Sequence, residues 1–138
     1  NYSLKAGAAQ SQISALRETN RLKIQETKNK IRQQELKVKS ERAAWVATQT
    51  DAKIANQQLT RNQELYNQGL ISLTDLESKQ NKYQATKAKE TEAQIKYENA
   101  GQDLSRLQIE LVRVQQEYAE KIAKISDAVE FIQAQNDA

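Results

Sequence analysis

The stretch RNQELYNQGLIS, residues 61–72, is the one place where this 138-residue chain departs from a continuous helical pattern. Glycine takes left-handed backbone conformations without steric penalty, so Gly69 is placed to close a first helix. Leu70, directly after it, can then contact Leu65, as in a Schellman ending. This half of the stretch predicts that a helix ends here.

A second helix is predicted to begin directly afterwards. Ser72 is a favourable N-cap, and Asp75, three residues on, completes a capping box and carries a charge that suits a helix N-terminus. Ile71 can pack against Leu76 as a hydrophobic staple. The stretch as a whole therefore predicts a turn between two helices.

The composition favours long helices and excludes most catalytic chemistry. The chain has no Pro, only three Gly and 38% apolar residues, and its mean hydropathy is −0.88; the plentiful Ala, Gln, Glu, Lys, Leu and Arg are good helix formers. Cys and His are absent, which removes thiol nucleophiles, imidazole bases, disulfides and the usual zinc ligands. We expect no enzymatic activity, no cofactor and no metal site.

Heptad periodicity predicts how the two helices pack. Seven-residue steps in the first half give an apolar seam whose companion seam, three residues later, is largely polar. The apolar seam consists of Ile24, Ile31, Val38, Trp45, Ala52, Leu59 and Tyr66. Leu22, Leu36 and Leu65 are candidates for broadening it. Each seam residue of this half should therefore contribute only a small part of the stability of the hairpin.

The second half repeats the pattern with one polar interruption, Glu90. Its first seam consists of Leu76, Tyr83, Glu90, Tyr97, Leu104, Leu111, Tyr118, Ile125 and Ile132. The second seam, starting at Lys79, is apolar chiefly in the half far from the turn, so packing should be firmest there. In an antiparallel hairpin, residues whose numbers sum to about 140 would meet, which pairs Trp45 with Tyr97.

The predicted fold is therefore all-α, a long antiparallel two-helix coiled-coil hairpin forming one domain over residues 1–138. Helix one is expected over about 2–67, the turn over 68–72 and helix two over about 73–137. At about 1.5 Å per residue, each arm would be roughly 100 Å long. The β-branched and polar stretch AAWVATQT, residues 43–50, leaves open whether helix one is continuous or kinked there.

The opposite net charges of the two halves support their pairing, and the basic residues of the first half are only weak evidence for nucleic-acid binding. Residues 1–67 carry a positive excess and residues 73–138 a negative one. Basic residues gather between Arg17 and Arg42, but four Glu interrupt the run and no aromatic or Gly-rich pattern accompanies it. We therefore expect no nucleic-acid binding. A nucleic-acid-binding hairpin would instead show salt-sensitive affinity depending on Lys23 to Arg42.

The turn region resembles a known family. Arg61, Leu65 and Ser72, in the frame quoted above, resemble the Arg-Leu-Ser tip motif of the haemolysin-D-type (HlyD) membrane fusion proteins, also called periplasmic adaptor proteins. The segment LTDLESKQNKYQATKAKETEAQIKYENAGQDL, residues 73–104, also resembles the second hairpin helix of that family. The resemblance covers the hairpin, and so essentially the whole chain.

The resemblance implies a periplasmic adaptor in a tripartite export system of Gram-negative type. The hairpin tip would dock on a TolC-like outer-membrane channel and connect it with an inner-membrane transporter of ABC or another type. Arg61 would donate hydrogen bonds to the channel's mouth, Leu65 would give an apolar contact, and Ser72 would cap helix two and present its hydroxyl. The long arms look like those of type I protein secretion members.

The family's other parts are not found in these residues. The resemblance implies that a lipoyl-like domain, a β-barrel domain and an inner-membrane anchor lie outside this segment, and that copies associate into a ring. The expected location is the periplasm, with the whole protein anchored in the inner membrane. The main alternative is a coiled-coil spacer or scaffold hairpin with no channel partner, which would be indifferent to Arg61.

Overall fold

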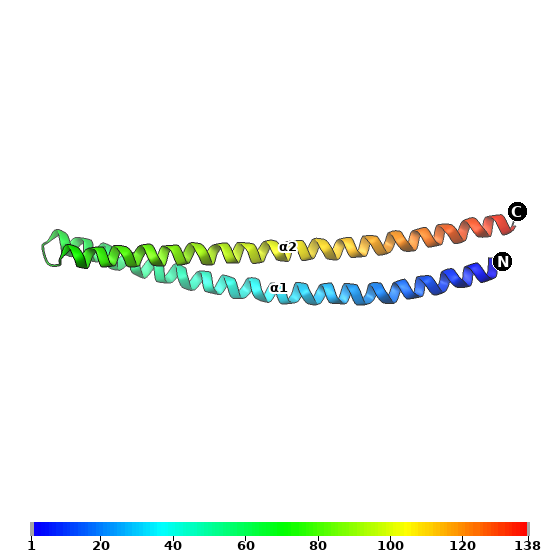
Figure 1. The fold of residues 1–138 in the computed structure, drawn as a ribbon, viewed down its shortest axis with the longest axis horizontal. Helices are drawn as coiled ribbons and strands as arrows, with labels where there is room; N and C mark the ends of the chain where they lie inside the picture. Colours follow the sequence, from blue (N-terminus) through cyan, green and yellow to red (C-terminus); the bar gives the residue numbers. More distant parts are fainter. Residues whose placement is uncertain (1, 138) are drawn as a thin grey trace. The chain divides into compact units, whose positions relative to one another are not determined.

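The computed structural model describes residues 2–137 and contains two helices, α1 (Tyr2–Asn67) and α2 (Leu73–Asp137), joined by the turn 68–72 (Figure 1). No strand occurs in this part of the chain. The all-α hairpin is confirmed, with helix bounds that agree with those predicted. Asn1 and Ala138 lie outside the described residues.

α1 is helical throughout the stretch 43–50, where its continuity was open. The two threonines of this stretch bond to carbonyls of their own helix: the Thr48 hydroxyl donates to the carbonyl of Trp45 at 2.7 Å, and that of Thr50 donates to Val46 at 3.2 Å. Both hydroxyls are satisfied without interrupting the helix. The stretch therefore does not divide α1 into two segments.

The chain forms two compact units, each made of one piece of α1 and one piece of α2. We call residues 34–104, which include the turn, the tip unit. The terminal unit combines residues 2–33 with residues 105–137.

In the tip unit, small side chains occupy the interface between the helices. The buried apolar residues, all at predicted seam positions, are Ala52, Ala55, Leu76, Ala93 and Ala100. An alanine methyl group lets two helix backbones approach closely, which explains how such small residues become fully covered. The interface is therefore narrow and rich in alanine.

The register of the tip unit is fixed by two contacts across the seam. The rings of Trp45 and Tyr97 lie with their centroids 5.4 Å apart at an interplanar angle of 38°. This contact confirms the predicted antiparallel pairing. In addition, the side-chain amide of Gln34 donates a hydrogen bond of 3.0 Å to the backbone carbonyl of Ala100.

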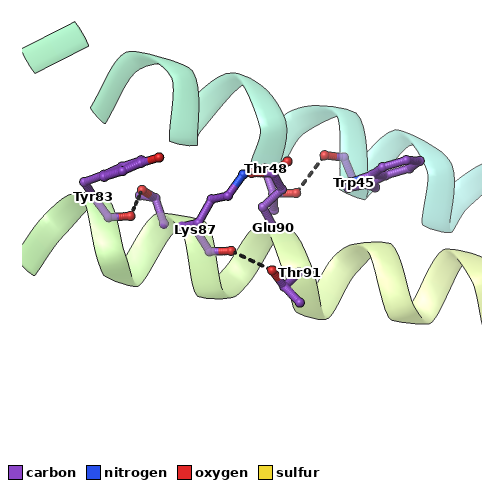
Figure 2. Close-up of polar contacts among 7 residues, drawn as sticks. Trp45, Thr48, Tyr83, Lys87, Glu90 and Thr91 are labelled. Atoms are coloured by element: carbon purple, nitrogen blue, oxygen red, sulfur yellow. Dashed lines mark hydrogen bonds and ion pairs between the residues drawn. The ribbon is translucent and has the colours of Figure 1, made fainter. Parts of the chain in front are cut away.

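Polar seam residues of the tip unit are satisfied mainly within their own helix. Figure 2 shows Thr48 of α1 and Lys87 and Glu90 of α2 in the space between the two helices. Thr86 donates to the Tyr83 carbonyl at 2.9 Å, and Lys87 pairs with Glu90 at 3.1 Å. The polar groups of these residues therefore have hydrogen-bond or ion-pair partners within their own helix and are not left unsatisfied between the helices.

In the terminal unit, larger seam residues are only partly covered. Val114 is the buried apolar residue among its described positions, and Thr27 is the buried polar one. Leu111 and Tyr118 are half-buried. The prediction that packing would be firmest far from the turn was therefore wrong, since most buried apolar residues lie in the tip unit.

Of the three candidates for broadening the apolar seam of α1, Leu65 is half-buried and the other two are not covered. Leu22 and Leu36 are both exposed, on the side of α1 away from α2. The polar companion seam therefore contributes to the interface directly, as Thr27 and Gln34 show. Within its described residues, neither helix has a stretch apolar and long enough to cross a membrane.

Candidate functional site at the turn

The end of α1 is closed by a Schellman motif. The N–H of Leu70 donates to the carbonyl of Leu65 at 2.9 Å, and the N–H of Gly69 donates to the carbonyl of Tyr66 at 2.9 Å. These are the two bonds that define the motif. Gly69 has φ of 74°, the left-handed conformation that a side chain would disfavour. The predicted role of Gly69 is confirmed.

The start of α2 is capped by Ser72. Its Oγ accepts a hydrogen bond from the N–H of Asp75 at 3.1 Å, and its carbonyl accepts the first helical bond, from Leu76, at 3.2 Å. Leu76 is buried and Ile71 is half-buried, as a hydrophobic staple requires. The N-cap predicted from the sequence is confirmed.

The capping box itself is only half formed. Among the described residues, the carboxylate of Asp75 accepts no hydrogen bond from the N–H of Ser72, so the reciprocal bond predicted from the sequence is absent. Asp75 is exposed and is the acidic residue in the first turn of α2. Its favourable contribution there is the interaction of its charge with the helix dipole.

Arg61 and Leu65 lie one turn apart on the same side of α1, in its last two turns. Arg61 is exposed and has neither an ion pair nor a side-chain hydrogen bond within residues 2–137. Leu65 is half-buried, and Ser72 is exposed across the turn. Arg61 therefore has a free guanidinium and no structural task in the fold.

Two apolar side chains at the turn are more exposed than the sequence suggested. Leu70 is 66% exposed, so any contact with Leu65 leaves most of it in solvent, and Leu73, the first residue of α2, is 53% exposed. Leu73 was not among the residues predicted to form the site. The signal was present: residues 65–74, LYNQGLISLT, contain no charged residue.

The turn region thus presents a hydrogen-bonding group and an apolar surface together. The planar guanidinium of Arg61 offers several donors in a fixed geometry, and Ser72 adds an exposed hydroxyl. Leu70 and Leu73 flank that hydroxyl in the sequence with large exposed side chains. Such a surface is suited to contact another protein, since it combines anchors for apolar burial with directed donors.

Comparisons with known proteins add no family assignment. The chain matches no protein-family model, no curated protein and no solved structure. The class that the structure itself defines is a two-helix hairpin with an uncharged, partly apolar turn.

Proposed function

We propose that this chain is the hairpin of a periplasmic adaptor in a tripartite export system. Its turn docks on a TolC-like outer-membrane channel, and the whole protein links that channel to an inner-membrane transporter. The observation that carries the proposal is the free, exposed Arg61 beside a rigidly capped turn. The proposal also rests on the resemblance of Arg61, Leu65 and Ser72 to the family's tip motif.

Arg61 supplies the directed part of the contact. A guanidinium can engage backbone carbonyls at the ends of partner helices without a buried counter-ion. Because Arg61 has no partner within the described part of this chain, binding a channel breaks no internal ion pair. Arg61 can therefore engage the channel without first giving up an internal partner.

Leu65, Leu70 and Leu73 supply the apolar part. Most of Leu70 and half of Leu73 are exposed in the hairpin, so both are available for burial against a partner. Their burial on docking releases ordered water, at about 25 cal/mol per Å² of apolar area removed from solvent. Ser72 keeps the turn in place, because its Oγ is occupied in capping α2.

The cellular setting follows from the same resemblance. The protein acts in the periplasm, is anchored in the inner membrane, and assembles as a ring of copies on an ABC-type transporter for type I protein secretion. The length of the helices, 66 and 65 residues, supports this choice over compact drug-efflux adaptors. The function needs no cofactor, metal or catalytic residue.

The test is co-purification of the protein with its outer-membrane channel, comparing the wild type with Arg61→Asp. Arg42→Asp is the matched control, because Arg42 is also exposed on α1 and lacks an ion pair within the described residues. We expect Arg61→Asp to lose the channel and Arg42→Asp to retain it, with helical melting unchanged in both. Retention of the channel by Arg61→Asp would show that Arg61 is not a docking residue, and failure of the wild type to co-purify with a channel would favour the spacer alternative.

A further inference from the structure

A groove of about 260 Å³ runs between α1 and α2 in the tip unit, and none of the residues that line it belongs to the turn. Its apolar lining comes from α1. Ala55 is 2% exposed, whereas Ile54 is 47% exposed and leaves much of its side chain in solvent. The groove therefore offers apolar surface that the hairpin itself does not cover.

Two threonines line the groove, and their hydroxyl protons are already used. Thr48 donates to the carbonyl of Trp45 at 2.7 Å, and Thr86 donates to the carbonyl of Tyr83 at 2.9 Å. The polar groups of the groove that remain free to recognise a partner are therefore the charged ones.

Three charged side chains line the groove: Lys82 and Lys89 on α2, and Asp51 on α1. All three are exposed, and none has an ion pair within residues 2–137. The two lysines are seven residues apart, so they lie on one side of α2, about 10 Å from each other along its axis. The α2 side of the groove is thus cationic at two points, and the α1 side is anionic at one.

The positive charge of the tip unit is concentrated around this groove. Residues 78–89 of α2 hold four lysines and no acidic residue, and residues 51–62 of α1 hold two basic residues and one acidic residue. Lys87 pairs with Glu90 at 3.1 Å, and the other basic residues of the two ranges have no ion pair in the described chain. Acidic residues return on both sides, at positions 64, 75 and 77 toward the turn and at 90 and 92 away from it. A local excess of this sign attracts an acidic partner.

The size of the groove and the position of Asp51 indicate the kind of partner. Pockets for whole small molecules usually measure about 300–1,000 Å³, so the groove is better suited to a few side chains of a larger partner. A nucleic-acid backbone or an anionic membrane is negative along its whole length and would set a charge against Asp51. An amphipathic helix can place its carboxylates opposite the lysines alone and still bury apolar side chains.

We propose that this groove binds an amphipathic helix of a partner protein. Two carboxylates of that helix, seven residues apart, face Lys82 and Lys89, a basic residue faces Asp51, and apolar side chains cover Ile54. The site does not depend on the docking function proposed above, because it shares no residue with the turn and uses a different partner chemistry.

The probe is a fluorescently labelled helical peptide of about 21 residues, long enough to hold helical structure in water. It carries two glutamates seven residues apart, leucines beside them on the same face, and a lysine on the other edge of that face. A comparison peptide has the same composition but spaces the glutamates five residues apart, which places them on different faces. In anisotropy titrations with the full chain, we expect the first peptide to bind about tenfold more tightly.

The lysines are tested by the double variant Lys82→Gln and Lys89→Gln, which should weaken binding of the first peptide about tenfold. The matched control is Lys39→Gln with Lys53→Gln. These two lysines are also exposed, lie on α1 of the same unit without ion pairs in the described chain, and do not line the groove. The control removes the same net charge and should leave the affinity unchanged. Helical ellipticity should be the same in both variants, since every changed position is exposed.

A charge exchange separates a specific contact from general attraction. The variant Lys82→Glu with Lys89→Glu should lose the first peptide and should bind a peptide in which the two glutamates are replaced by lysines. Absence of this restored binding would overturn the proposal. So would equal weakening by the Gln variant and its control, or equal affinity for the two glutamate spacings.

The same titration tests the other occupants of the groove. A single-stranded oligonucleotide or phosphatidylglycerol vesicles that displace the peptide as well as unlabelled peptide does would show a site for polyanions, which overturns the proposal. Unlabelled chain carrying Lys82→Gln and Lys89→Gln is the third competitor. Displacement of the peptide from the wild type by that chain would show that a second copy occupies the groove, and the partner-helix proposal would then be wrong.

Discussion

The tip unit and the terminal unit share one heptad pattern but bury it to different depths. In the tip unit the most covered apolar side chains are alanines, with Ala55 and Ala100 each 2% exposed. In the terminal unit Val114 reaches 4%, while the larger Leu111 and Tyr118 remain half-buried. In a pair of helices without a third layer, a small side chain is covered by the partner backbone, whereas a large one keeps an edge in water. Small size therefore favours burial at these seam positions, with Leu76 beside the turn, 3% exposed, as the exception among the large side chains.

The largest effect should come from placing a charge in the seam of the tip unit. Ala55→Glu forces a carboxylate into a position that is 2% exposed, so we expect a loss of about 3 kcal/mol or more in the free energy of unfolding even though Lys82 and Lys89 line the pocket beside Ala55. Helical ellipticity at 222 nm, followed against temperature and urea, measures this loss.

The matched change in the terminal unit is Ala128→Glu, which also lies on a predicted seam. Ala128 is exposed, so the carboxylate stays in water and the expected loss is below about 0.5 kcal/mol. Equal destabilisation by the two substitutions would contradict the difference between the units.

A smaller effect is expected at the turn. Gly69→Ala forces a side chain into a backbone with φ of 74°, which costs about 1–2 kcal/mol. Gly101→Ala in α2 of the same unit should act in the opposite direction and stabilise by about 1 kcal/mol, because alanine is the better helix former. An added Cβ at Gly101 meets nothing within 4 Å. If both variants shifted the melting temperature in the same direction, the backbone strain at Gly69 and the helix propensity at Gly101 could not be the causes.

Most of the fold was predictable because its signals are local. Gly69 and Ser72 mark the turn through the chemistry of single residues, and the heptads of α1 and α2 fix which faces meet. The depth of burial was not predictable from apolar counts, because it depends on how closely the two backbones approach. At the turn, the bonding roles of the capping residues were predicted, but the exposure of Leu70 and Leu73 was not, since it depends on what the surrounding helices leave uncovered.

The single tryptophan allows the two units to be followed separately. Trp45 lies in the tip unit against Tyr97, so its fluorescence reports the melting of that interface. If the alanine-lined interface is the more stable one, the emission of Trp45 should shift to that of a solvent-exposed indole with a midpoint a few degrees above the midpoint of helical ellipticity. Such a difference is expected because local stability differs along a structure.

A matched probe for the terminal unit is Tyr118→Trp combined with Trp45→Phe. The second change also removes an indole N–H that is buried without a hydrogen-bond partner in the described chain, so the added loss should be small. The emission of the introduced tryptophan is expected to shift at a lower midpoint temperature than the emission of Trp45 in the wild type. Coincident midpoints for both probes and for ellipticity would show that the units unfold together.

The smallest effect concerns an ion pair in the terminal unit. The Arg21 guanidinium donates to the Glu18 carboxylate at 2.7 and 3.1 Å, and this hydrogen bonding, with the attraction of the charges, lowers the pKa of Glu18 below its ordinary value. A carboxyl group whose pKa is lowered by folding adds stability above its unfolded pKa and loses it as the pH falls through the folded pKa. Both groups are fully exposed, so the gain is slight. An NMR titration of the Glu18 carboxyl carbon should show the lowered pKa, and Arg21→Gln should raise it; an unchanged titration in the variant would mean that the pair does not persist in solution.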